Sequence, residues 1–208
     1  MICKEGKMMF TERNKNKFGE SPNEILIRCL EKDDFTEWNE WRDNHKNGHI
    51  SLKGACLSNA NLEGADLSQV DLKMADLKNV NLPGADLSEA DLAGADLSHA
   101  NLIGADLWRA DLKFANLYEA NLKSAQLQKA NLENAELVRI NLESADLWKA
   151  NLIGAKFISV VVDRQTFIWG CDFDEQTVFS GAGLSKARIE PRLIEHMRKN
   201  IRWVKCDI

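Results

Sequence analysis

The stretch ADLSEADLAGADLSHANLIGADLWR, residues 85–109, consists of five consecutive copies of the pentad Ala-(Asp/Asn)-Leu-x-x. This pentad repeats twenty-two times without an insertion between Ile50 and Ile158. Leu occupies every fifth position from Leu52 to Leu152, and Phe157 closes the series. The architecture of more than half the chain therefore depends on which backbone can bury one residue in five on a single side.

An α-helix and a flat β-strand both fail this requirement. Each helical residue turns by ~100°, so a Leu at every fifth position would visit all faces of the helix. Side chains of a strand alternate, so an odd spacing sends successive Leu residues to opposite faces. A chain that turns a corner after each pentad can point all of its Leu and Ala residues inward.

The number of corners in each coil can be inferred from two longer periods in the sequence. Gly within the array stands only at positions ending in four, which gives a ten-residue period. Gly is expected where a type II turn requires positive φ at its third residue. A twenty-residue period is carried by one column of amides, Asn61, Asn81, Asn101, Asn121 and Asn141. Coils of twenty residues would stack these side chains at ~4.8 Å as an amide ladder. The sequence thus predicts an all-β solenoid with four sides of five residues per coil.

The array of Ala-(Asp/Asn)-Leu-x-x pentads closely resembles the pentapeptide-repeat protein family. The resemblance covers more than half the chain, and it implies a right-handed quadrilateral β-helix in which the Leu and Ala positions face inward. The handedness comes from this resemblance, since the periods do not show it.

The segment before the array is expected to close one end of the solenoid, because an open coil exposes its core and its unpaired backbone. Residues 1–20 are polar and are expected to be a loose N-terminal segment. Residues 21–49 are predicted to form a helical N-terminal cap of two helices, the second ending near Gly48. The packing stripe of this cap is Phe35, Trp38 and Trp41.

The segments after the regular coils of residues 50–158 are expected to close the other end. Residues 159–189 are predicted to continue as irregular coils in which the register slips by one residue twice. Residues 190–208 carry apolar positions at helical spacing and are predicted to form a C-terminal helix. That helix closes the end or pairs with a second copy of itself as a homodimer.

Composition narrows the classes of function. The 27 basic and 32 acidic residues give a net charge of −5, which argues against direct nucleic-acid binding. The N-terminus lacks the apolar core of a signal peptide, and no stretch approaches the ~18 consecutive apolar residues of a membrane-spanning helix. The five cysteines form no C-x-x-C pair, so neither a disulfide framework nor a zinc site is expected. A cytoplasmic location is the simplest setting.

No catalytic, cofactor or metal site is predicted. A nucleophile, a base and an orienting group must converge in a pocket, and a solenoid filled with Leu and Ala offers none along its length. The chain also lacks G-x-S-x-G, P-loop and H-E-x-x-H motifs. We therefore expect a protein that is not an enzyme and needs no cofactor.

The first functional hypothesis comes from charge. Residues 61–115 hold ten acidic against four basic residues, whereas residues 116–158 hold five of each. Some pentapeptide-repeat proteins act on DNA gyrase, protect it from quinolones and are thought to imitate DNA, so the resemblance implies a DNA-mimic modulator of gyrase or topoisomerase as an alternative function. Those relatives favour Phe at the central position, whereas this array has a single Phe. The candidate acidic face consists of Asp66, Asp71, Asp76, Asp86, Asp91, Asp96, Asp106 and Asp111.

The second hypothesis comes from a candidate interaction strip. Trp108 and Trp148 fall in one column two coils apart, each followed by a base, Arg109 and Lys149, with Lys129 between them. Exposed Trp beside Arg or Lys is enriched at protein interfaces. The alternatives are that these are scattered surface residues, or that the C-terminal segment folds back over them. The main prediction is a non-catalytic protein-binding or scaffold module for an unidentified protein partner.

Overall fold

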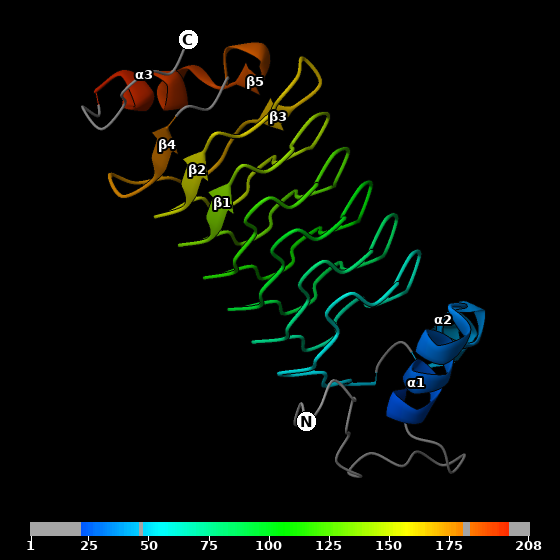
Figure 1. The fold of residues 1–208 in the computed structure, drawn as a ribbon. Helices are drawn as coiled ribbons and strands as arrows, with labels where there is room; N and C mark the ends of the chain where they lie inside the picture. The colour runs from blue at the N-terminus through cyan, green and yellow to red at the C-terminus, as the bar shows by residue number, and fades with distance from the viewer. Residues whose placement is uncertain (1–21, 46–47, 181–183, 200–208) are drawn as a thin grey trace.

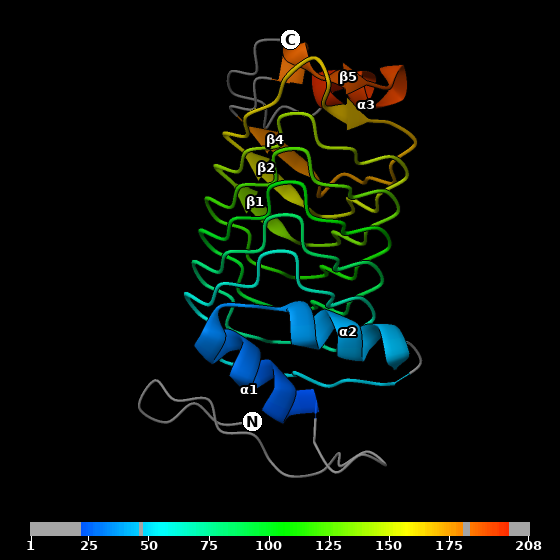
Figure 2. The ribbon, with the colours of Figure 1, turned by 90° about the vertical axis from the view of Figure 1, so that its right-hand side faces the viewer.

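The computed structural model describes residues 22–45, 48–180 and 184–199. The pentads form a stack of coils, with helices α1 (Pro22–Lys32) and α2 (Thr36–Asn44) at its N-terminal end and helix α3 (Pro191–Lys199) at its C-terminal end (Figure 1). A view at right angles shows the same stack, with α1 and α2 beside the first coils (Figure 2).

Stacked positions in the array are twenty residues apart. Parallel bridges join residue i to residue i+20, from Ser51–Asp71 through Asn131–Asn151. The bridged residue within the array is the one before the central Leu, so the bridges fall into columns along the stack. The twenty-residue period of the Asn positions is therefore a period of the backbone.

The interior of the stack is filled by the repeated Leu and Ala. The central Leu residues from Leu52 to Leu152 and the closing Phe157 are at most 1% exposed. Phe157 stacks on Phe179 of the next coil, with ring centroids 4.8 Å apart and planes at 13°. Burial of each such side chain contributes at most ~1.5–3 kcal/mol.

A residue with positive φ stands at every corner of the array. The residue two places after each central Leu has φ between 53° and 68°, whether it is Gly, as at Gly94, or not, as at Arg109. The ten-residue Gly period therefore does not mark a second kind of corner. Stacking holds the other residues in a left-handed conformation that costs them on the order of 1 kcal/mol each. The N–H of Arg109, for example, donates to Gln128 O of the next coil at 3.0 Å.

Two helices precede the array. Helix α1 spans Pro22–Lys32 and helix α2 spans Thr36–Asn44, so the second helix ends before the predicted limit near Gly48. Phe35 and Trp38 are buried, and Trp41 is half-buried with its ring stacked on Trp38 at 5.8 Å.

Side chains of α2 complete the backbone hydrogen bonding of an early coil. Trp38 Nε1 donates to Asp66 O at 2.7 Å, and Asn39 Oδ1 accepts Asp66 N–H at 2.9 Å. Arg42 Nη2 donates to Ser68 O at 2.5 Å, and its Nε lies 3.5 Å from the Asp66 carboxylate. In later coils the corresponding N–H and C=O groups bond to the backbone of the coil before.

After the array, two turns of the form Asp-x-x-Thr each add one residue to a coil. Asp163 Oδ1 accepts Thr166 N–H at 2.9 Å, and the buried Thr166 hydroxyl donates to Leu142 O at 2.8 Å. Asp174 and Thr177 repeat this arrangement, with the Thr177 hydroxyl donating to Leu152 O at 2.9 Å.

The stacking register records both additions. Bridged residues are twenty apart at Asn141–Val161, twenty-one at Asp146–Phe167 and twenty-two at Lys156–Val178. Strands β1 (Glu136–Val138), β2 (Lys156–Ile158) and β4 (Val178–Ser180) form one parallel sheet, and β3 (Phe167–Ile168) pairs with β5 (Arg188–Ile189).

A 3-10 turn, Leu184–Lys186, and helix α3, Pro191–Lys199, end the described chain. Leu193 of α3 is fully buried against the last coils. Residues 200–208, which were included in the predicted C-terminal helix, lie outside the described residues, as do residues 1–20. Pairing of α3 with a second copy, and folding of the final residues over the Trp positions, therefore stay predictions. None of the helices in the described ranges has the length and apolar character needed to cross a bilayer.

The cysteines of the described residues occur in two states. Cys29 and Cys171 are buried free thiols, whereas Cys56 is disulfide-bonded.

Candidate functional site

Each aspartate of the candidate acidic face forms a hydrogen bond that stabilises the turn of its own pentad. All eight carboxylates are half-buried and accept the backbone N–H two residues further on, at 2.9–3.3 Å. This arrangement is an Asx turn. Asp at the second position of the pentad is therefore a structural element as well as a source of charge, a role that the frequency of Asp and Asn before the central Leu could have indicated.

The eight aspartates do not share one face. They fall into three bridged columns, because a step of five residues carries the chain to the next column: Asp66, Asp86 and Asp106; Asp71, Asp91 and Asp111; Asp76 and Asp96. Some are also neutralised, since Lys73 Nζ lies 2.5 Å from Asp91 and Lys78 Nζ lies 3.3 Å from Asp96. The prediction of a single acidic face is corrected on this point.

The Asn column forms side-chain hydrogen bonds in its first three members. Asn81 Nδ2 donates to Asn61 Oδ1 at 2.7 Å, and Asn101 Nδ2 donates to Asn81 Oδ1 at 2.8 Å. Asn121 and Asn141 continue the bridged column, and their Oδ1 atoms accept turn N–H groups at 3.2 and 2.9 Å.

A second column of this kind was missed from the sequence. Asn131 Nδ2 donates to Asp111 Oδ1 and Asn151 Nδ2 donates to Asn131 Oδ1, both at 3.0 Å. The same twenty-residue spacing carries these contacts, but the column changes from Asp to Asn along its length.

The residues of the candidate interaction strip lie in two adjacent columns, one with Trp108 and Trp148 and the other with Arg109, Lys129 and Lys149. Lys129 Nζ lies 5.8 Å from the ring centroid of Trp108 and 5.7 Å from that of Trp148, so it bridges the two indoles. The Arg109 guanidinium carbon lies 4.9 Å from the Trp108 centroid, and Lys149 Nζ lies 4.4 Å from the Trp148 centroid. Each such contact stabilises its geometry by roughly 0.5–1 kcal/mol at an exposed site.

Trp169 extends the column of Trp108 and Trp148, and it was missed from the sequence. Lys149 N–H donates to Trp169 O at 2.9 Å, the bond that Lys129 N–H makes to Trp148 O one coil earlier. Trp169 is 43% exposed, and its ring is parallel to that of Phe167 at 6.2 Å. It follows Trp148 by twenty-one residues because of the residue added before Thr166. We call the set Trp108, Arg109, Lys129, Trp148, Lys149 and Trp169 the tryptophan–cation strip.

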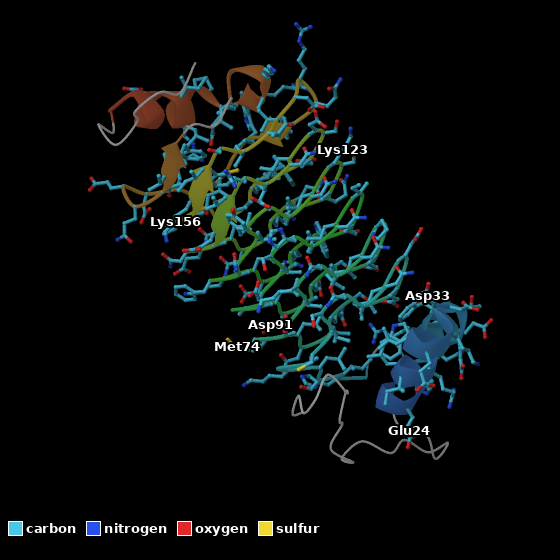
Figure 3. All side chains as sticks on the ribbon, viewed as in Figure 1. Glu24, Asp33, Met74, Asp91, Lys123 and Lys156 are labelled. Atoms are coloured by element: carbon cyan, nitrogen blue, oxygen red, sulfur yellow. The ribbon has the colours of Figure 1, made fainter. Side chains whose placement is uncertain are left out.

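Charged side chains project around the whole stack, and most lysines of the coils face carboxylates. In Figure 3, Lys156 projects from β2 and Lys123 projects from another edge of the coils. Lys156 Nζ is 2.7 Å from Glu136, and Lys123 Nζ is 3.2 Å from Glu143. These pairs join residues twenty apart, as the Asp and Asn contacts do.

Two groups near the end of the array have strongly shifted pKa values. Burial acts to raise the pKa of Asp163, but hydrogen bonds from Ser144 and Thr166 outweigh it and hold this pKa at about 2. Burial raises the pKa of the Cys171 thiol to about 12. The thiol donates to Leu147 O at 3.0 Å, which is typical of a structural cysteine.

The chain is similar to known proteins that are built from the same repeat. A family model described as pentapeptide repeats matches residues 49–84, 75–109, 95–134 and 135–161. Among solved structures, a pentapeptide repeat protein from the Arabidopsis thaliana thylakoid lumen is 34% identical over 44% of this chain and 67% of its own, with a TM-score of 0.39.

Two further solved structures are similar over more of the chain. A pentapeptide repeat protein from Nostoc Pcc 7120 is 30% identical over 65% of this chain and 94% of its own, with a TM-score of 0.28. The plasmid-mediated fluoroquinolone resistance protein QnrB1 is 19% identical over 74% of this chain and 85% of its own, with a TM-score of 0.43. No curated protein matches the chain significantly. The chain belongs to the pentapeptide-repeat family, and this membership implies a right-handed β-helix.

Proposed function

We propose that this protein is a non-catalytic protein-binding or scaffold module that presents a rigid surface on a right-handed quadrilateral β-helix. The observation that carries the proposal is the tryptophan–cation strip. The indoles of Trp108 and Trp148 are partly exposed and contact cations, and that of Trp169 stacks on Phe167, so little side-chain freedom is lost on binding. Trp and Arg are also the residues most enriched among those that dominate binding energy.

We propose that α1 and α2 cap the N-terminal end of this helix and that α3 closes the other end. Support comes from Trp38 and Asn39, whose side chains supply to Asp66 a donor and an acceptor that a preceding coil would otherwise supply. An unpaired first coil would present its backbone groups to other chains. The cap therefore keeps association confined to the sides.

A catalytic function has little support. A depression of about 300 Å³ beside α2 is lined by carboxylates, amides, one Phe and one Thr. Among the described residues, no group of three or more His, Cys, Asp or Glu is arranged to hold a metal ion.

Affinity capture from cell extract tests the proposed function. We expect Trp108→Ala with Trp148→Ala to lose bound partners that the wild-type protein retains. A matched control is Met74→Ala with Phe114→Ala, which removes exposed apolar side chains (67% and 60% exposed) from a different column. If the Trp variant kept every partner and any self-association of the wild type, the strip would not be a binding surface.

The alternative of a DNA-mimic modulator of gyrase rests on the acidic excess of residues 61–115 and on family membership. Against it stand the division of the eight aspartates among three columns and their hydrogen bonds to turn N–H groups. A supercoiling assay separates the two functions. We expect no inhibition of gyrase and no protection from quinolones at high protein concentration, and either effect would favour the alternative.

A further inference from the structure

We infer, building on the proposed protein-binding function, that the tryptophan–cation strip binds an extended, acidic segment of another polypeptide. Arg109 of the strip already pairs with a carboxylate, because its Nη1 lies 3.4 Å from Glu89 Oε1, so Lys129 and Lys149 are the cations that carry the inference.

The strip contains the two lysines between residues 61 and 158 that lack a carboxylate partner among the described residues. Of the seven lysines between residues 61 and 158, five lie within 4.0 Å of a carboxylate: Lys73, Lys78, Lys113, Lys123 and Lys156. Within the described chain, Lys129 and Lys149 have no such neighbour and contact indole rings instead. In a protein of net charge −5, these cations form a local site for a partner of opposite charge.

The hydrogen-bonding groups of the strip side chains are all donors. Indole offers one N–H, ammonium three and guanidinium five, and none of these groups accepts a hydrogen bond. Trp38 Nε1 is bonded to a backbone carbonyl, whereas the indole N–H groups of the strip make no hydrogen bond within the described residues. Carboxylates and peptide carbonyls are the acceptors that complement such a surface.

The ring geometry favours a polypeptide over a single-stranded nucleic acid. Binding of bases by aromatic side chains requires a free ring face on which each base stacks. Lys129 already lies over Trp108 and Trp148, Lys149 lies over Trp148, and Trp169 stacks on Phe167. A peptide can instead pack along the ring edges and pair its carboxylates with the ammonium groups.

The dimensions of the strip fit a short extended segment. Trp108, Trp148 and Trp169 span three coil steps, which is about 14 Å at ~4.8 Å per step. An extended chain advances ~3.3 Å per residue, so on the order of four to five residues cover the strip. Long Lys and Arg stems allow the cations to follow carboxylates whose spacing differs from that of the coils.

Fluorescence anisotropy with a labelled octaglutamate peptide tests the inference. We expect binding at low ionic strength, accompanied by a change in tryptophan fluorescence and weakened by 0.5 M salt. Exposed ion pairs account for at most a few-fold in affinity each, so Lys129→Gln should weaken binding about three- to fivefold and the double variant with Lys149→Gln about tenfold. Gln suits this corner, because Gln69 occupies the corresponding position with φ 59°.

Lys53→Gln is the matched control, since Lys53 is exposed and lies in the first coil away from the strip. We expect this variant to bind octaglutamate as the wild type does. Equal weakening by Lys53→Gln and Lys129→Gln, absence of octaglutamate binding at low salt, or tighter binding of an eight-nucleotide oligo-dT would each overturn the inference.

Affinity capture separates failure of this inference from failure of the proposed function. Loss of partners in the Trp108→Ala/Trp148→Ala variant, but not in the Lys129→Gln/Lys149→Gln variant, would keep protein binding and reject an acidic partner. Loss of partners in neither variant would reject both. Loss in both variants, with octaglutamate competing for capture, is the expected result.

Discussion

Leu107→Ala is expected to destabilise the protein by about 4 kcal/mol. Leu107 is fully buried. The substitution removes three carbon groups from the side chain, and this loss of burial costs about 2.4 kcal/mol at ~0.8 kcal/mol for each group. Its coil cannot collapse into the space, because Leu107 N–H donates to Gln126 O at 2.7 Å and Leu87 N–H donates to Asp106 O at 2.7 Å. The residual cavity therefore places the cost in the upper half of the ~2–5 kcal/mol range for Leu→Ala.

Urea denaturation followed by far-UV circular dichroism measures this loss. Ile103→Ala is the control, because Ile103 lies on an outward position of a neighbouring pentad and is 39% exposed. We expect the control to cost less than about 1 kcal/mol, as is usual for surface changes. If Leu107→Ala cost less than about 2 kcal/mol, or no more than Ile103→Ala, the inward position of the repeated Leu would be refuted.

Three further changes test the hydrogen bonds and thiols of the coils. The hydrogen bonds that hold the pKa of Asp163 at about 2, below 3.8, stabilise the fold above about pH 4, and this stability is lost as the pH falls toward 2. Asp163→Asn should flatten that part of the curve of unfolding free energy against pH, and an unchanged curve would contradict the assignment. Asn81→Asp places an oxygen against Asn61 Oδ1 and keeps the contact to Asn101. It should lower the free energy of unfolding, measured with urea at pH 7, by about 1–2 kcal/mol. No loss of stability would argue against the amide ladder. Cys171, with its pKa raised to about 12, should react with iodoacetamide at pH 8 only after denaturation, as mass spectrometry would show; rapid labelling of the native protein would contradict its burial.

The interior could be predicted from the sequence because the five-residue period of Leu admits few backbones. The family resemblance is confirmed by the match to residues 49–161, and the Asn spacing of twenty reappears as the backbone bridges. The two helices predicted within residues 21–49 are present and span Pro22–Lys32 and Thr36–Asn44.

Other features depended on contacts that no period reports. Trp169 joins the strip only because the turn ending at Thr166 adds a residue, which hides it from a count of twenty. In the sequence the aspartates are recognised by their charge alone, whereas in the structure their carboxylates also accept hydrogen bonds from the turns. Asp106 Oδ1, for example, accepts Trp108 N–H at 2.9 Å. The bonds from Trp38 to an early coil depend on how a helix docks, and helical spacing alone does not contain that information.

The twenty-residue register makes changes of chain length act as rotations or as translations. Insertion of one pentad after Ala120 would turn every later coil by one corner, so that Trp148 would leave the column of Trp108 and the strip would be split. Insertion of four pentads at the same place would leave both tryptophans in one column and move them apart by ~4.8 Å. Duplication within such a gene can therefore either lengthen a binding surface or redistribute its residues around the stack, without altering the interior.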